Sequence, residues 1–198
     1  MDSRLRKLEV TELSAAQRGL YDKLTSGPRG GTDRFALCDE DGRLQGPFNA
    51  MLLRPPLGDA LQALGAQLRY SSTFGDRARE LAILAVGHAW GSDFEVYAHE
   101  RIGRTAGLSE AELAAVRDGR LGDLGDPAER LTATLAHTLA TRSDLTDQEY
   151  QAGRAALGDD GLFELMTLVS YYAALALQLR VFRVPVPGAE PDPGGGAT

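Results

Sequence analysis

The chain has 198 residues and a net charge of −7, and 43% of its residues are hydrophobic. This length and composition are sufficient for one globular domain with a buried core. The acidic residues are scattered, and the clustered Lys and Arg of a nucleic-acid surface are absent. No basic amphipathic helix is present, and no apolar run approaches the roughly 20 residues of a membrane span. We therefore expect neither nucleic acid nor membrane as a partner.

Cys38 is the single cysteine of the chain. One thiol cannot form an internal disulfide, which favours a reducing compartment. Residues 1–10 contain no apolar core of the kind a signal peptide needs, so a cytoplasmic location is expected. A nucleophilic role for Cys38 would need a base and an electropositive setting. Its acidic neighbours, Asp39 to Asp41, would instead raise the thiol pKa.

Helical signals dominate the first part of the chain. Ser14 and Gln17 form a capping box that predicts a helix up to Gly27. Residues 27–46 are rich in Gly, Pro and Asp and predict a long ordered loop, a feature that is often functional. Two helices should follow, a short one at 47–54 and a longer one at 55–70 that opens with two prolines.

The second part of the chain continues the helical pattern. The clearest helix is predicted at 76–90, and Gly91 separates it from the next. The other predicted helices are 92–107, a short one capped at Ser109, 126–141, 146–158 and 159–180. The last is apolar around most of its circumference and should be central to the fold or buried against another subunit. We expect an all-α fold with one helical domain over 1–183 and a disordered tail over 184–198.

Three polar residues of the 92–107 helix share one face. Ser92, Glu95 and His99 are separated by three and then four positions, which stacks them along the helix. A carboxylate one turn before a histidine can fix the tautomer and raise the pKa of the imidazole. If the flanking helices pair antiparallel about Gly91, Glu80 approaches His99. This arrangement predicts a general acid–base site.

Simpler roles exist for the same residues. Ser92 and Glu95 also fit a capping box, in which both side chains satisfy free backbone N–H groups. Glu95 and His99 could form an exposed pair of small energetic value, about 0.3 kcal/mol. These interpretations remain open at the level of the sequence.

Glu80 and His99 also admit other partners. Glu80 could form an ion pair on a solvated face with Arg77 or Arg79. His99 and two carboxylates could ligate a metal, but HExxH and a second histidine one turn from His99 are absent, so no metal is expected. The other histidines lie among apolar residues and are expected to be packing residues: His88 and His137.

The run RxRELAILxVGHxWGSxxExxxHExIGRTAGLSxxEL, at 77–113, resembles the central motif of the carboxymuconolactone decarboxylase family. The upstream residues 44–49, LQGPFN, followed by Pro55, resemble the segment that precedes the core hairpin of this family. The similarity is clear over 43–113 and looser through the last helix. It implies the alkyl hydroperoxidase D-like fold and a homo-oligomer, commonly a trimer or a multiple of it.

The resemblance also bears on chemistry. The peroxidase branch of the superfamily carries a CxxC, and the two corresponding positions here are Ser92 and Glu95, so a disulfide-based peroxidase is not expected. The decarboxylase branch implies a lyase that removes CO2 from a carboxylated lactone without metal or organic cofactor. Isomerisation, cyclisation, hydration or ring opening, and a non-catalytic binding role, are the alternatives.

The resemblance and the spacing together assign roles. The catalytic candidates are His99 as the proton-transfer residue, with Glu95 or Glu80 setting its tautomer and charge. A small carboxylated or enolisable substrate should contact Pro47, Phe48, Asn49, Trp90, Ser92 and Tyr97. Asn49 could donate a hydrogen bond to a carbonyl or enolate oxygen. Arginine candidates for the substrate carboxylate are Arg79, Arg101 and Arg104.

Overall fold

The computed structural model describes residues 3–27 and 36–188. Within these residues the regular structure is helical, apart from one isolated β-bridge between Cys38 and Leu44. The predicted all-α fold is thereby confirmed. The chain divides into two compact units, which we call unit 1 (residues 1–63 and 177–198) and unit 2 (residues 64–176).

Unit 1 begins with the 3-10 turn η1 (Val10–Glu12) and the helix α1 (Ala15–Ser26). The predicted capping box is present, because Ser14 accepts from the Gln17 backbone N–H and the Gln17 side chain accepts from the Ser14 N–H. The predicted loop at 27–46 lies partly outside the described residues. It leads into α2 (Pro47–Met51), which is shorter than the predicted helix at 47–54.

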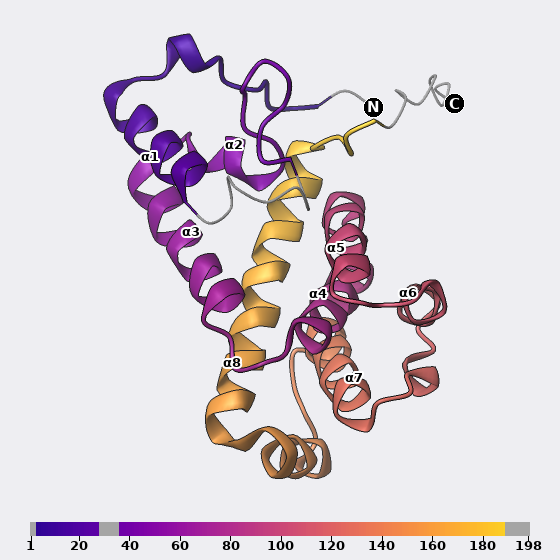
Figure 1. Cartoon of the computed structure of the whole chain (residues 1–198). Helices are drawn as coiled ribbons and strands as arrows, with labels where there is room; N and C mark the ends of the chain where they lie inside the picture. Colours follow the sequence, from indigo (N-terminus) through magenta and orange to yellow (C-terminus); the bar gives the residue numbers. More distant parts are fainter. Residues whose placement is uncertain (1–2, 28–35, 189–198) are drawn as a thin grey trace, which may run out of the picture. The chain divides into compact units, whose positions relative to one another are not determined.

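The helix α4 (Asp76–Ala89) is the centre of unit 2, because residues 79–87 are all buried. It packs against three other helices of the unit, α5 (Asp93–Thr105), α6 (Glu110–Arg117) and α7 (Pro127–Arg142) (Figure 1). The turn between α4 and α5 contains Gly91, whose φ of 57° favours glycine. The predicted pairing of these two helices about Gly91 is confirmed.

Arg77 joins the start of α4 to two other elements of unit 2. Its guanidinium lies 2.9 Å from Glu129 of α7 and 2.5 Å from Glu112 of α6. A third hydrogen bond goes to the Gly107 carbonyl. Since Arg77 is held by these partners, it does not form the ion pair with Glu80 that the sequence left open.

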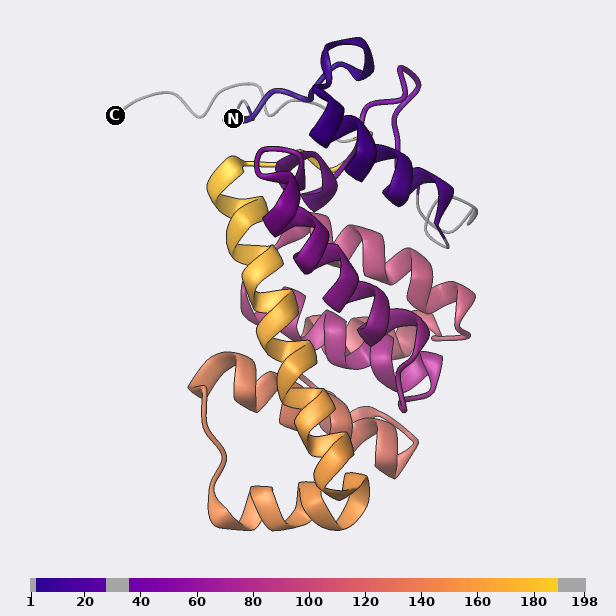
Figure 2. The same cartoon turned by 90° about the vertical axis from the view of Figure 1, so that its left-hand side faces the viewer.

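Two further long helices complete the chain. The helix α3 (Pro55–Tyr70) opens with the expected prolines, and α8 spans Asp147–Phe182. Gly158 interrupts α8 with φ 74° and ψ 175°, so the chain turns there and the two predicted helices meet at this residue (Figure 2). The second part of α8 buries Leu165, Leu168 and Tyr172 but leaves Phe163 68% exposed.

The length and composition of α8 also meet the criteria for a membrane-spanning helix. It is the one described helix that is long and apolar enough to cross a membrane, with a mean hydropathy of 1.4 over its best window. Half of that window is buried inside the protein. A core helix of a soluble protein passes the same test, so length and composition alone give weak evidence here.

The backbone at Gly158 generates a stability prediction. Its dihedral angles fall in a region that is essentially restricted to glycine, and an added Cβ would lie 2.8 Å from Asp160 Oδ1. We expect Gly158→Ala to lower the free energy of unfolding by about 1–3 kcal/mol. Chemical denaturation followed by circular dichroism measures this change.

Gly19 provides the matched control. It lies within α1, and an added Cβ would meet nothing within 4 Å. Gly19→Ala should therefore raise the free energy of unfolding by about 0.5–1 kcal/mol. Equal effects of the two substitutions would contradict the interpretation of the Gly158 backbone.

Candidate functional site

Glu80 and His99 meet in the interior of unit 2. Glu80 comes from α4 and His99 from α5, and His99 Nδ1 lies 2.6 Å from Glu80 Oε2. Glu80 has no exposed surface and His99 is 6% exposed. The approach of these residues across the Gly91 turn, which the sequence predicts, is present. The bond is formed out of water, where an interaction between charges is strong.

Glu95 lies on the other side of the same imidazole. Its Oε2 is 3.4 Å from His99 Nε2, and the residue is 4% exposed. The alternative of an exposed pair is therefore wrong. Because Glu80 faces Nδ1 and Glu95 faces Nε2, the imidazole stands between two carboxylates. Glu80 accepts from Nδ1–H, which directs the reactive nitrogen, Nε2, toward Glu95.

Two arginines supply positive charge near Glu80. Arg79 Nε lies 3.7 Å from Glu80 Oε1, and its Nη2 bonds Asp76 at 2.7 Å. Arg69, in the last turn of α3, interacts electrostatically with the Tyr172 hydroxyl and with Glu80. A buried carboxylate is costly unless it is paired, and these cations together with His99 provide the compensation.

The neighbouring charges determine the protonation of the pair. Burial alone would raise the pKa of Glu80, but His99, Arg69 and Arg79 outweigh it and hold that pKa below its ordinary value. Burial would lower the pKa of His99, but Glu80 and then Glu95 outweigh it and raise that pKa. Between the ordinary pKa values of the two groups, the pair is therefore a carboxylate and an imidazolium. His99 can act as a proton donor.

An aromatic pair on α8 borders the imidazole. The rings of Tyr172 and His99 are perpendicular, with centroids 5.1 Å apart, and Tyr171 packs in the same way on Tyr172 at 5.2 Å. Burial raises the pKa of Tyr172, so its hydroxyl stays protonated. Tyr172 thus presents an apolar ring to His99 and a neutral hydroxyl to Arg69.

The capping box that Ser92 and Glu95 could form is absent, so that alternative is wrong. Ser92 is the N-cap residue of α5, but its side chain makes no capping hydrogen bond. The Glu95 side chain, which would complete the box, turns to His99 instead. The Ser92 hydroxyl is 1% exposed and has no hydrogen-bond partner within the described part of the protein. It is a free polar group beside the acid–base residues of the same helix.

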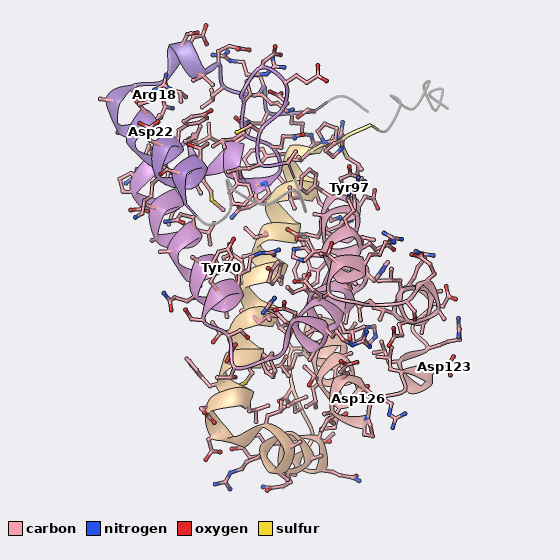
Figure 3. All side chains as sticks on the ribbon, viewed as in Figure 1. Arg18, Asp22, Tyr70, Tyr97, Asp123 and Asp126 are labelled. Carbon is pink, nitrogen blue, oxygen red and sulfur yellow. The ribbon has the colours of Figure 1, made fainter. Side chains whose placement is uncertain are left out.

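The remaining predicted residues of unit 2 lie elsewhere on their helices. Trp90 is the half-buried C-cap residue of α4. Tyr97 comes from α5 (Figure 3), two positions before His99, which separates their directions by about 200° on an α-helix. Arg101 lies over the Tyr97 ring at 5.0 Å. The structure does not bring Tyr97 together with His99.

The other predicted substrate contacts lie in unit 1. Pro47, Phe48 and Asn49 form the start of α2. The Asn49 amide is used locally, because Oδ1 accepts from the Leu8 N–H at 2.9 Å and Nδ2 donates to the Arg6 carbonyl at 3.0 Å. A contact between these residues and a substrate stays a prediction.

Several residues weighed in the sequence lie outside this cluster. Arg104 pairs with Glu100 and Glu110. Cys38, in unit 1, has a pKa that burial raises, which disfavours the thiolate. Within residues 3–27 and 36–188, no group of three or more His, Cys, Asp or Glu has an arrangement suited to a metal ion.

Sequence reasoning missed Arg69 and Tyr172. Tyr172 lies 73 positions after His99, and Arg69 lies 11 positions before Glu80 on a different helix. Neither stands in a motif, because Arg69 ends an ordinary helix and Tyr172 belongs to an apolar run. The tandem Tyr171 and Tyr172 was the one available signal, since a buried tyrosine hydroxyl needs a polar partner.

Comparison with known proteins identifies the region that holds the site. Residues 55–138 match the model of the carboxymuconolactone decarboxylase family. No curated protein sequence matches the chain.

Solved structures share the fold. A peroxidase-related protein with an alkylhydroperoxidase AhpD core, from Ralstonia eutropha, has a TM-score of 0.72 and 17% identity, over 94% of this chain and 93% of that one. A peroxidase-related protein from Silicibacter has a TM-score of 0.73 and 12% sequence identity, over 94% of this chain and 92% of that one. A protein of unknown function from Agrobacterium tumefaciens has a TM-score of 0.64 and 18% sequence identity, over 73% of this chain and 100% of that one. At these identities the likeness concerns the fold alone.

The ion pair generates a prediction for stability against pH. The raised pKa of His99 contributes stability below its ordinary value, about 6.5, and the lowered pKa of Glu80 contributes above its ordinary value, about 4.3. The contribution is therefore largest between these values, and it is lost as the pH rises through the folded pKa of His99 or falls through that of Glu80. Glu80→Gln should lower the free energy of unfolding in this window by about 3 kcal/mol.

The same variant reports on the histidine. Because the Glu80 charge is the largest influence that raises the pKa of His99, Glu80→Gln should lower that pKa. Nuclear magnetic resonance titration of the His99 ring measures it, and His137, on α7, serves as an internal control. A His99 titration that is unchanged in Glu80→Gln would contradict the assigned pairing.

Proposed function

We propose that this chain is an acid–base enzyme with His99 as the proton donor, a proposal supported by the match of residues 55–138 to the carboxymuconolactone decarboxylase family model. The observation that carries the proposal is the buried imidazole between two carboxylates, 2.6 Å from Glu80 and 3.4 Å from Glu95. A histidine on the protein surface would need neither partner. Enzymes use such surroundings to adjust a proton donor to its reaction.

The proposed reaction is decarboxylation of a small lactone or enolisable carbonyl compound that bears a carboxylate. The C–C bond to the carboxylate breaks, CO2 leaves, and the electron pair remains as an enolate conjugated with the carbonyl. The proton on His99 Nε2 then forms the new C–H bond. One C–C bond is lost and one C–H bond is gained, without a net change in oxidation of the protein.

The two carboxylates have different roles in this scheme. Glu80 accepts from Nδ1–H throughout, which keeps the ring orientation and stabilises the imidazolium before the proton is given up. Glu95 faces Nε2, the nitrogen that loses its proton. It is placed to return a proton from water to His99 after each turnover.

Two other groups suit the substrate. Arg69 has no carboxylate within ion-pair distance in the described residues, so its guanidinium can bind a substrate carboxylate. The Ser92 hydroxyl, which lacks a protein acceptor there, can donate to the carbonyl oxygen on which enolate charge develops. These groups would also serve isomerisation, cyclisation, hydration or ring opening through an enolate.

Substitution of the proton donor tests the proposal. His99→Gln should lower kcat by about 10²–10⁴-fold, because the amide cannot donate a proton at neutral pH. CO2 release from a panel of carboxylated unsaturated lactones is the assay. His137→Gln, at a partly buried histidine of α7 outside the His99 cluster, is the control and should keep wild-type kcat. Full turnover by His99→Gln would overturn the proposed function.

The pH profile offers an independent check. Since the reaction needs protonated His99, kcat should fall as the pH rises through the raised pKa of that residue. Glu95 contributes to raising this pKa, so in Glu95→Gln the fall should move to lower pH. A profile that rises over the same range would assign His99 the role of a base instead.

A further inference from the structure

The His99 ring needs more than its two carboxylates to keep its orientation. A histidine ring can rotate about its Cβ–Cγ bond, and the torsion has broad energy wells. Rotation would carry Nδ1 away from Glu80 Oε2 and Nε2 away from Glu95. Some group must therefore pack against the flat surface or edge of the imidazole.

Tyr172 provides that packing. Its ring is at 89° to the imidazole with 5.1 Å between centroids, a favoured geometry for aromatic pairs. Tyr171 in turn packs against Tyr172, with the two rings perpendicular and their centroids 5.2 Å apart. Both tyrosines are buried, at 5% and 6% exposure, so neither ring has space to reorient freely.

The hydroxyl of Tyr172 serves a second group. Arg69 interacts electrostatically with this hydroxyl and also with Glu80. A long arginine side chain loses conformational entropy when it binds a ligand. The loss on binding is smaller if a partner in the protein already holds the side chain in place. Tyr172 thus contacts His99 with its ring, and its hydroxyl interacts with Arg69.

We propose that Tyr172 is a positioning residue of this site: its ring fixes the orientation of the His99 imidazole and its hydroxyl fixes the Arg69 guanidinium. This inference rests on the proposed function for its effect on turnover. Its effect on the His99 ring is a property of the folded protein alone. The two arms of the proposal can therefore be tested separately.

Two substitutions separate the ring from the hydroxyl. Tyr172→Phe removes the hydroxyl and keeps the ring, whereas Tyr172→Leu removes the ring as well. Tyr172→Met is a second ring-free variant, since its adaptable side chain fills irregular space if Tyr172→Leu fails to fold. Tyr171→Phe is the control for removal of a buried hydroxyl on the neighbouring residue of α8.

The first readout is independent of activity. The exchange rate of the His99 Nδ1 proton with solvent and the ring titration are measured by nuclear magnetic resonance. Tyr172→Phe and Tyr171→Phe should match the wild type. Tyr172→Leu or Tyr172→Met should increase the exchange rate about tenfold or more, because the ring is freer to leave Glu80. A wild-type exchange rate in a folded ring-free variant would overturn the role of the ring.

The second readout is the division between KM and kcat. Tyr172→Phe should raise KM for a carboxylated substrate about tenfold with little change in kcat, because Arg69 is less well held. The ring-free variants should lower kcat by about 10–100-fold through misplacement of His99. Unchanged KM in Tyr172→Phe would overturn the role of the hydroxyl.

The outcomes also distinguish this inference from the proposed function. If His99→Gln keeps full turnover while the ring-free variants show faster proton exchange, the proposed function fails and the positioning of the ring stands. If His99→Gln is inactive while the ring-free variants behave as the wild type in both readouts, Tyr172 has no positioning role.

Discussion

The site depends on a carboxylate that has no contact with water. Glu80 lies on the fully buried part of α4, where an unpaired charge would be strongly unfavourable. Its charge is retained because α5 supplies His99 at 2.6 Å and two arginines lie nearby. The positions of α3, α4 and α5 within unit 2 are therefore linked through one ionised group. The cost of burying that group is offset only when all of its partners are in place.

This constraint explains why the polar cluster is suited to proton transfer. Burial alone would lower the pKa of the imidazole, and the two carboxylates together raise it. A proton on either ring nitrogen has a carboxylate facing it. The helix hairpin that brings them together lies within the residues that match the family model.

Much of this arrangement could be predicted from the sequence because it is local. The spacing of Glu95 and His99 and the turn at Gly91 fix which side chains share a face, and the helix boundaries followed from caps and prolines. Ser92 and Glu95 do not form the capping box that the sequence left open, because the Glu95 side chain turns to His99 of the same helix. Arg69 and Tyr172 could not be predicted, because neither stands in a motif and their approach to Glu80 and His99 is produced by helix packing.

The unpartnered hydroxyl of Ser92 has a thermodynamic consequence. A buried polar group without a hydrogen bond costs roughly 1–3 kcal/mol, so the folded protein is less stable than its packing alone would make it. A molecule that accepts a hydrogen bond from this hydroxyl recovers part of that free energy on binding. Ligand affinity and resistance to heat are thereby coupled. Compounds with a well-placed carbonyl should be recognisable by the rise in melting temperature that they cause, before any reaction is known.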